Sequence, residues 1–61
     1  MNEVWWKTYS GWEKLYSDAD YTVAKNWALN HISYSSSATL KVEIRNPYGD
    51  PEIIWNKEWS N

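Results

Sequence analysis

Apolar and polar residues alternate most regularly between positions 39 and 45. Leu40, Val42 and Ile44 take every second position, and the positions between them are polar. This period of two is typical of a β-strand that has one face in a core and the other in solvent. The residues expected on the solvent face are Thr39, Lys41, Glu43 and Arg45.

A turn and a second strand follow this alternation. Asn46, Pro47 and Gly49 occupy the first, second and fourth positions that these residue types favour in a type I turn. The apolar residues 53–55 then predict a returning strand, so the two strands form an antiparallel hairpin. We expect its inner face to carry Ile53, Trp55 and Trp59, and its outer face to carry Ile54, Asn56 and Glu58.

The middle of the chain has the period of a helix. Ser17, followed three residues later by Asp20, has the form of an N-cap box and predicts a helix from about Asp18 to Asn30. Four residues of one stripe recur at helical spacing, and we expect Trp27 at the centre of the core. The stripe consists of Ala24, Trp27, Ala28 and His31. The serine-rich residues 33–37 are expected to form a flexible loop.

The first seventeen residues fit either a hairpin or a helix. Their rings at helical spacing are those of Trp5, Tyr9, Trp12 and Tyr16. Aromatic and β-branched residues favour strands, however, and Gly11 in the middle of a helix would cost about 1 kcal/mol relative to alanine. With Ser10 and Gly11 as a tight turn, residues 3–9 and 12–17 are expected to form a hairpin.

These elements predict an α+β fold in which a small antiparallel sheet carries one helix on one face. The expected order is ββαββ, and the alternative is βαββ if the first hairpin does not form. A chain of 61 residues is expected to be a single small domain, residues 1–61. The expected core residues of the first hairpin are Val4, Trp6 and Leu15, joined by Trp27 and Trp55 from the later elements.

The assumed two-residue turn sets the register of the first hairpin. The register pairs Tyr9 with Trp12, Lys7 with Lys14 and Trp5 with Tyr16, all six on one face. Two facing lysines are unfavourable unless they lie over rings or meet an anionic group. With Lys41 and Arg45 of the later strand, this face becomes an aromatic surface with interleaved basic side chains.

The composition also points to a binding surface. The chain has 6 tryptophans, 5 tyrosines and no phenylalanine, so every ring carries an N–H or O–H group. Such rings are over-represented at the energetic centres of binding sites. We therefore expect a non-enzymatic protein-binding module, a small inhibitor or adaptor of the kind that phages and mobile elements encode. Its expected partner-binding residues are Trp5, Lys7, Tyr9, Trp12, Lys14, Tyr16, Lys41 and Arg45.

Two other functions stay open. A single-stranded nucleic acid would stack on the same rings and contact the basic side chains. The net charge of −2 and the scattered acidic residues dilute any basic field, so nucleic acid ranks below protein. The third function is self-association as a homodimer, through the exposed face or an edge strand.

Catalytic and metal chemistry have little support in the sequence. The chain has no cysteine, and His31 is its single histidine, which interaction with a helix dipole explains better than acid–base catalysis. We expect no catalytic residue, no metal and no cofactor. No apolar run approaches the roughly 20 residues of a membrane span. Because Glu3 and Lys7 also flank the apolar residues of the N-terminus, we expect a cytoplasmic protein with no membrane partner.

Overall fold

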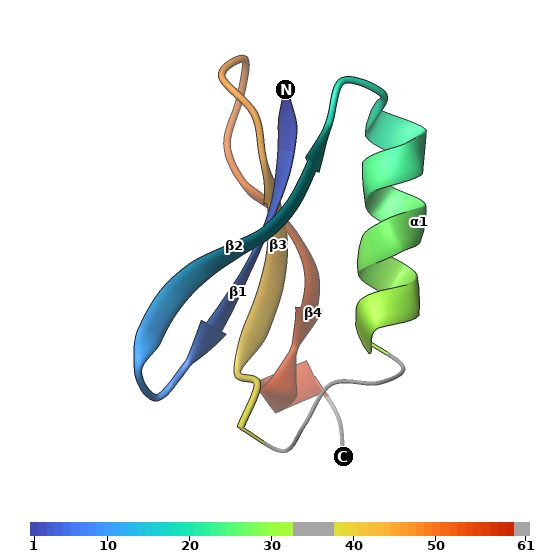
Figure 1. Cartoon of the computed structure of the whole chain (residues 1–61). Coiled ribbons are helices and arrows are strands. Elements are labelled where there is room, and N and C mark those ends of the chain that lie inside the picture. Colours follow the sequence, from blue (N-terminus) through green and yellow to red (C-terminus); the bar gives the residue numbers. More distant parts are fainter. Residues whose placement is uncertain (33–37, 60–61) are drawn as a thin grey trace.

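A computed structural model describes residues 1–32 and 38–59 of the chain, and the predicted serine-rich loop lies outside these residues. Figure 1 shows the elements that these residues form. In chain order they are β1 (Asn2–Thr8), β2 (Gly11–Asp18), α1 (Tyr21–Ile32), β3 (Lys41–Arg45), β4 (Glu52–Asn56) and the short 3-10 helix η1 (Lys57–Trp59).

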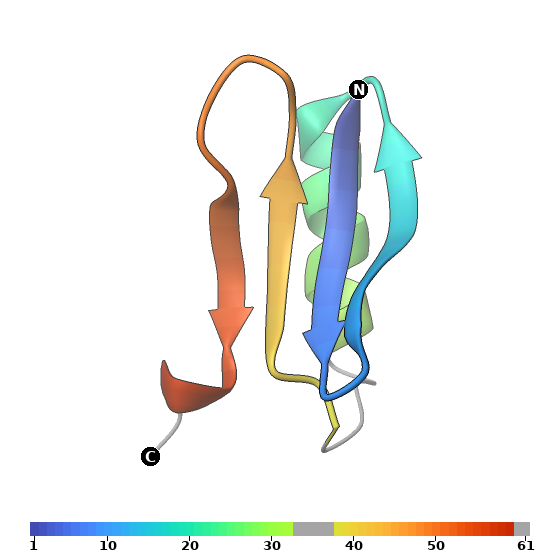
Figure 2. The ribbon, with the colours of Figure 1, turned by 90° about the vertical axis from the view of Figure 1, so that its left-hand side faces the viewer.

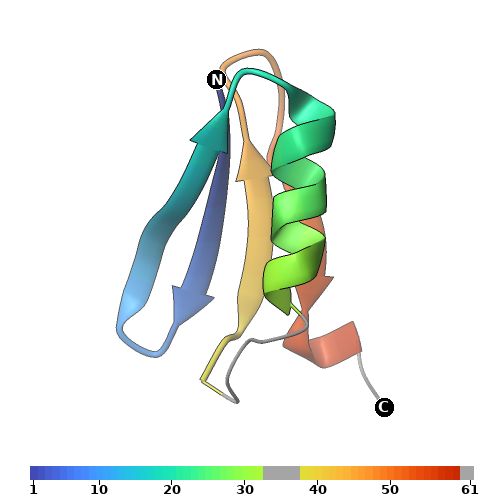
Figure 3. The same ribbon diagram turned by 45° about the vertical axis from the view of Figure 1, so that its right-hand side comes forward.

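The strands form one antiparallel sheet in the order β2-β1-β3-β4. α1 packs on one face of this sheet, as Figure 3 shows from the helix side. Figure 2 shows the opposite side, which we call the open face. The open face carries Glu3, Trp5, Lys7, Trp12, Lys14, Lys41, Glu43, Arg45 and Ile53. The predicted α+β fold with ββαββ order is therefore confirmed, and the βαββ alternative is excluded.

The core lies between α1 and the two central strands. Its buried residues are Val4, Ala24, Ala28, Val42 and Ile44, each no more than 1% exposed. Because alanine is small, α1 comes close to the sheet along this line. Trp6, Trp27 and Trp55 pack around the cluster, as predicted. The prediction that Trp27 forms its centre is wrong, because the alanines take that place, and Trp59 is 57% exposed.

The helix begins later than predicted. Asp20 is the N-cap, because its Oδ1 accepts hydrogen bonds from the backbone N–H of Thr22 at 2.8 Å and of Val23 at 3.2 Å. Ser17 does not cap the helix, since it belongs to β2 and lies opposite Glu3 of β1. The pairing of β2 with β1 thus prevails over the N-cap box read from the sequence.

The register of the first hairpin differs from the predicted one. Its turn is formed by Tyr9 and Ser10, and Lys7 lies opposite Trp12. Gly11 is the first residue of β2 and does not stand at the centre of the turn, where it was predicted. Its φ of +116° is one that residues with a side chain rarely adopt.

A β-bulge between Val4 and Trp5 changes the pairing again along β1. Trp5 lies opposite Lys14, whereas Val4 lies opposite Tyr16. Leu15 is the extra residue of β2, and it does not belong to the core cluster in which it was predicted. The bulge therefore brings Tyr16 to the helix side, where it packs against the core.

A second bulge affects the hairpin of β3 and β4. Trp55 lies opposite Val42 on the helix side, but Ile53 lies opposite Glu43 on the open face. The prediction for Trp55 is confirmed, and that for Ile53 is wrong. Ile54, predicted on the outer face, packs against the core instead. Before β3, Thr39 is 1% exposed and is therefore not the solvent-facing residue that the alternation predicted.

Replacement of Gly11 by alanine tests the turn. No heavy atom would lie within 4 Å of the added Cβ, so the cost is that of the backbone conformation alone. We expect Gly11→Ala to lower the free energy of unfolding by about 1–2 kcal/mol in urea denaturation followed by tryptophan fluorescence. Gly49→Ala is the matched control, because Gly49 has no positive φ and equal space. An equal loss in both variants would contradict the role given to Gly11.

Candidate functional site

An arginine lies over the rings of two tryptophans on the open face. The guanidinium carbon of Arg45 is 4.4 Å from the ring centroid of Trp5 and 4.6 Å from that of Trp12. Both distances lie within the roughly 6 Å over which a cation is attracted to the face of a ring. Three strands contribute to this tryptophan–arginine cluster of Trp5, Trp12 and Arg45, so it links β1, β2 and β3 on the solvent side.

Two carboxylates hold the cluster in place. Glu43, which is 7% exposed, accepts a hydrogen bond from Nε of Arg45. Glu3 accepts a hydrogen bond from the indole N–H of Trp5 at 3.0 Å, and its other oxygen lies 3.7 Å from Nζ of Lys14. The Trp5 N–H, with a smaller contribution from Lys14, holds the pKa of Glu3 below its usual value. The rings and the guanidinium are thus oriented before any partner arrives.

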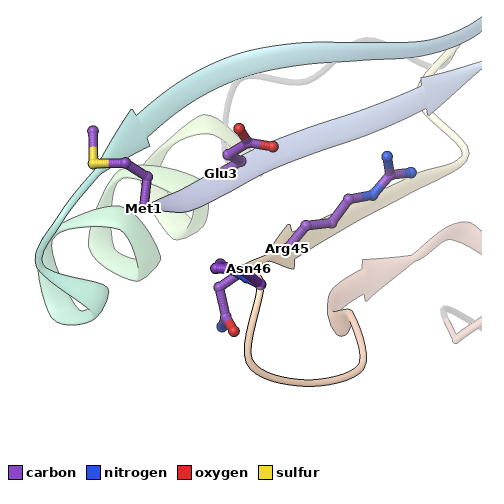
Figure 4. Close-up of a pocket in the computed structure, with 5 residues that line it drawn as sticks. Met1, Glu3, Arg45 and Asn46 are labelled. Atoms are coloured by element: carbon purple, nitrogen blue, oxygen red, sulfur yellow. The ribbon is translucent and has the colours of Figure 1, made fainter.

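A surface pocket of about 410 Å³ adjoins the cluster at the start of β1 and the end of β3. Its lining includes Met1, Glu3, Arg45 and Asn46, whose side chains Figure 4 shows, together with Pro47. In that view Glu3 and Arg45 extend from neighbouring strands. The pocket therefore offers apolar surface next to one acidic and one basic side chain.

Most of the predicted binding residues do share the open face. Those that the structure brings together there are Trp5, Lys7, Trp12, Lys14, Lys41 and Arg45. Tyr16 is a correction, since it lies on the helix side, where its ring stacks on Trp27 with centroids 4.9 Å apart. Tyr9 lies in the turn, 77% exposed, with Nζ of Lys57 5.9 Å from its ring centroid.

The helix side holds a second group of rings. Trp27 stacks on Tyr16 and also on His31, at 5.2 Å, while the ring of Trp6 meets His31 edge-on at 5.0 Å. His31 does lie in the last turn of α1, where interaction with the helix dipole was predicted. Its ring contacts were not predicted. These rings pack between the layers and therefore contribute to the fold.

Positive charge is concentrated on the open face. Four basic and two acidic side chains give this face a formal charge of +2, whereas the whole chain has −2. The acidic surplus consequently lies on the helix side and in the turns. The separation of charge between the two faces could not be predicted, because acidic and basic residues are mixed along the sequence.

Two lysines face each other on neighbouring strands. Lys7 of β1 lies directly opposite Lys41 of β3, not opposite Lys14 as the predicted register required. Like charges directly opposite on a sheet are destabilising. In residues 1–32 and 38–59, no carboxylate lies within ion-pair distance of either lysine. Lys7 has the ring of Trp12 as a neighbour, with Nζ 5.9 Å from the centroid.

Comparison of the chain with protein-family models, curated proteins and solved structures finds no match. Within the described residues, no group of three His, Cys, Asp or Glu side chains is arranged to hold a metal ion. No helix in this part of the chain has the length and apolar character needed to cross a membrane.

Removal of the Lys41 charge tests the lysine pair. We expect Lys41→Gln to raise the free energy of unfolding by up to about 1 kcal/mol, because the repulsion from Lys7 disappears. Thermal denaturation at low salt measures the change, and added salt should reduce it. Lys14→Gln is the control, since Lys14 has Glu3 as its ion-pair partner and its loss should not stabilise the fold. A destabilised Lys41→Gln variant would contradict the repulsion.

An ion pair between the layers gives a pH prediction. Glu52 of β4 accepts a hydrogen bond from the hydroxyl of Tyr21 and lies 3.4 Å from Nζ of Lys25, and these contacts, Tyr21 first, lower its pKa. A carboxylate whose pKa is lower in the folded state stabilises the fold at pH values above its unfolded-state pKa of about 4.3. This stabilisation is lost as the pH falls through the folded-state pKa.

We therefore expect Glu52→Gln to be less stable than the native chain by at most about 1 kcal/mol at pH 7, because the pair is partly exposed. The difference should vanish as the pH falls below about 4. Urea denaturation at a series of pH values measures it. Asp50→Asn, in the turn before β4, is the control for removal of a carboxylate that no ion pair of the described residues includes. A constant gap from pH 7 to pH 3 would exclude the charge of Glu52 as its cause.

Proposed function

We propose that this chain is a non-enzymatic protein-binding module that docks its open face on an acidic and partly apolar surface of a partner protein. The observation that carries the proposal is the tryptophan–arginine cluster. Tryptophan and arginine are the residue types most enriched among side chains that dominate binding energy. Because hydrogen bonds and cation–π contacts already fix them, they lose little conformational entropy on binding.

Exposure and charge support the choice of partner. Trp12 is 38% exposed and Ile53 39%, so apolar surface is accessible on both sides of the sheet centre. The formal charge of +2 on this face favours an acidic partner surface. The module would act by covering that surface, as an inhibitor or an adaptor does. A chain without cysteine is compatible with a reducing compartment, so the cytoplasm is the proposed location.

Single-stranded nucleic acid is the second candidate, and the basic side chains next to tryptophan rings favour it. Stacking of bases needs free ring faces. Arg45 lies over the rings of both Trp5 and Trp12, and the carboxylates of Glu3 and Glu43 share the same face. An acidic protein surface therefore fits better than a strand of nucleic acid.

Self-association is the third candidate. β2 is an edge strand of eight residues, and a second copy would pair along it through backbone hydrogen bonds. The bulge opposite Val4 and Trp5 bends β2 and increases its local twist, which makes continuous pairing of two β2 edges less favourable.

Truncation of Trp12 tests the proposed function. A partner captured from lysate in the presence of nuclease would first be identified and purified, and its affinity then measured by calorimetry. We expect Trp12→Ala to weaken binding by at least about 30-fold, the size of a hot-spot residue, while the circular dichroism spectrum stays native. Tyr48→Ala is the control, because Tyr48 is 93% exposed in the turn between β3 and β4, away from the cluster.

Three results would overturn this proposal. Unchanged affinity in Trp12→Ala would remove the cluster from the interface. Binding of oligonucleotides with a steep decrease in salt would favour nucleic acid. A concentration-dependent dimer in light scattering, abolished by changes in β2, would favour self-association.

A further inference from the structure

A second pocket of about 410 Å³ lies at the opposite end of the open face from the one in Figure 4. It is the lower end of the sheet in Figure 2, where β1 and β4 end and β3 begins. We call it the lysine pocket, and its lining includes Lys7, Tyr9, Leu40, Lys41, Asn56 and Lys57. Lys57 and Asn56 were not predicted to belong to a site.

Backbone hydrogen bonds join three distant chain segments at this pocket. The N–H of Leu40 donates to the carbonyl of Lys7 at 2.7 Å, and the N–H of Lys57 donates to the carbonyl of Leu40 at 2.9 Å. The side-chain oxygen of Asn56 accepts a hydrogen bond from the N–H of Glu58 at 3.0 Å. The backbone bonds hold the segments that carry Lys7, Lys41 and Lys57 next to one another.

The net charge of the pocket lining favours a negatively charged ligand. Three ammonium groups and one carboxylate, that of Glu58, give the lining a formal charge of +2. Lys7 and Lys41 face each other directly, and within the described residues no carboxylate neutralises either of them. A negatively charged ligand would relieve this repulsion.

The shape and the donors favour carboxylates on a peptide over a single phosphate. The volume far exceeds that of one oxyanion, since a water molecule occupies only about 30 Å³ of the liquid. The backbone N–H groups of Leu40 and Lys57 donate within the fold, so these two groups cannot bind a phosphate. Tyr9 and Leu40 add apolar surface to the lining.

We propose that the lysine pocket binds a short acidic segment of the partner protein. Neighbouring Asp or Glu carboxylates of this segment pair with Lys7, Lys41 and Lys57, and an apolar side chain between them contacts Tyr9 and Leu40. The assignment rests on the proposed function, because it names the chemistry of the partner at one end of the same face.

Nuclear magnetic resonance titration of the full, ¹⁵N-labelled chain tests the pocket. The probe is the acetylated and amidated pentapeptide EELEE, and QQLQQ is its uncharged counterpart. We expect EELEE to shift the amide signals of Leu40, Lys41, Asn56 and Lys57 most strongly, and QQLQQ to leave them unchanged.

Charge variants show whether the pocket or the general field of the protein binds the probe. The double variant Lys41→Gln/Lys57→Gln should weaken EELEE binding by at least about tenfold. Lys14→Gln on the same face and Lys25→Gln on the helix side should each weaken it by less than about twofold. Lys7 is left intact because its ammonium group lies over the ring of Trp12. We expect all variants to keep a native spectrum outside the pocket, since no lysine belongs to the buried core.

Several outcomes would overturn the lysine pocket. They are equal binding of QQLQQ, an equal effect of Lys14→Gln, and tighter binding of inorganic phosphate or of an eight-residue oligothymidylate at the same residues.

Measurements with the purified partner distinguish a failure of this proposal from a failure of the proposed function. If Trp12→Ala loses the partner while Lys41→Gln/Lys57→Gln retains it, the pocket assignment is wrong and the docking face stands. If the double variant loses both EELEE and the partner while Trp12→Ala binds normally, the pocket stands and the role of the cluster is wrong.

Discussion

The close packing of one helix against the two central strands is the constraint on which the rest of the structure depends. Ala24 and Ala28 meet Val4, Val42 and Ile44, and each of the five is essentially excluded from solvent. A chain of 61 residues has a single helix longer than one turn in its described part, so only one sheet face is covered. The open face must therefore be stable in water, and its side chains bind each other instead of a second layer.

The two β-bulges decide which side chains reach each face. Without the bulge in the first hairpin, Tyr16 would follow Trp12 and Lys14 onto the open face; with it, Tyr16 stacks on Trp27. The bulge in the second hairpin likewise turns Ile53 outward while Trp55 stays on the helix side. A bulge inserts one residue and so reverses the alternation beyond it. The composition of the candidate site is thus a consequence of these two local irregularities.

The same irregularities explain what the sequence could and could not predict. The strand at Val42 and Ile44 was predictable because its alternation is unbroken, and the helix because its apolar stripe has a clear period. The start of the helix was not, because Ser17 and Asp20 are both good caps and only strand pairing separates them. The register of the first hairpin depends on the φ of Gly11, which the residue type permits but does not specify.

Some features of the candidate site follow from the local sequence pattern, and others depend on contacts between distant parts of the chain. Trp5, Lys7 and Arg45 were predictable as residues of one face, because period-two patterning determines the face of a regular strand. The contact of Arg45 with two rings could be predicted only from the strand order. The approach of Lys57 to Lys41 depends on a backbone hydrogen bond between segments that are far apart in the sequence. No local pattern carries that information.

The tryptophan–arginine cluster and the lysine pair of the open face differ in how their charges are satisfied, and this difference fits two steps of one binding event. At the cluster, Arg45 has Glu43 and Lys14 has Glu3, so the charges are neutralised internally and the rings are oriented. At the lysine pair, Lys7 and Lys41 face each other, and no carboxylate of the described residues pairs with either. Unneutralised surface charge mainly accelerates association with an oppositely charged partner, whereas well-packed rings mainly slow dissociation. In the proposed complex, the lysines would attract the partner and the tryptophan–arginine cluster would retain it.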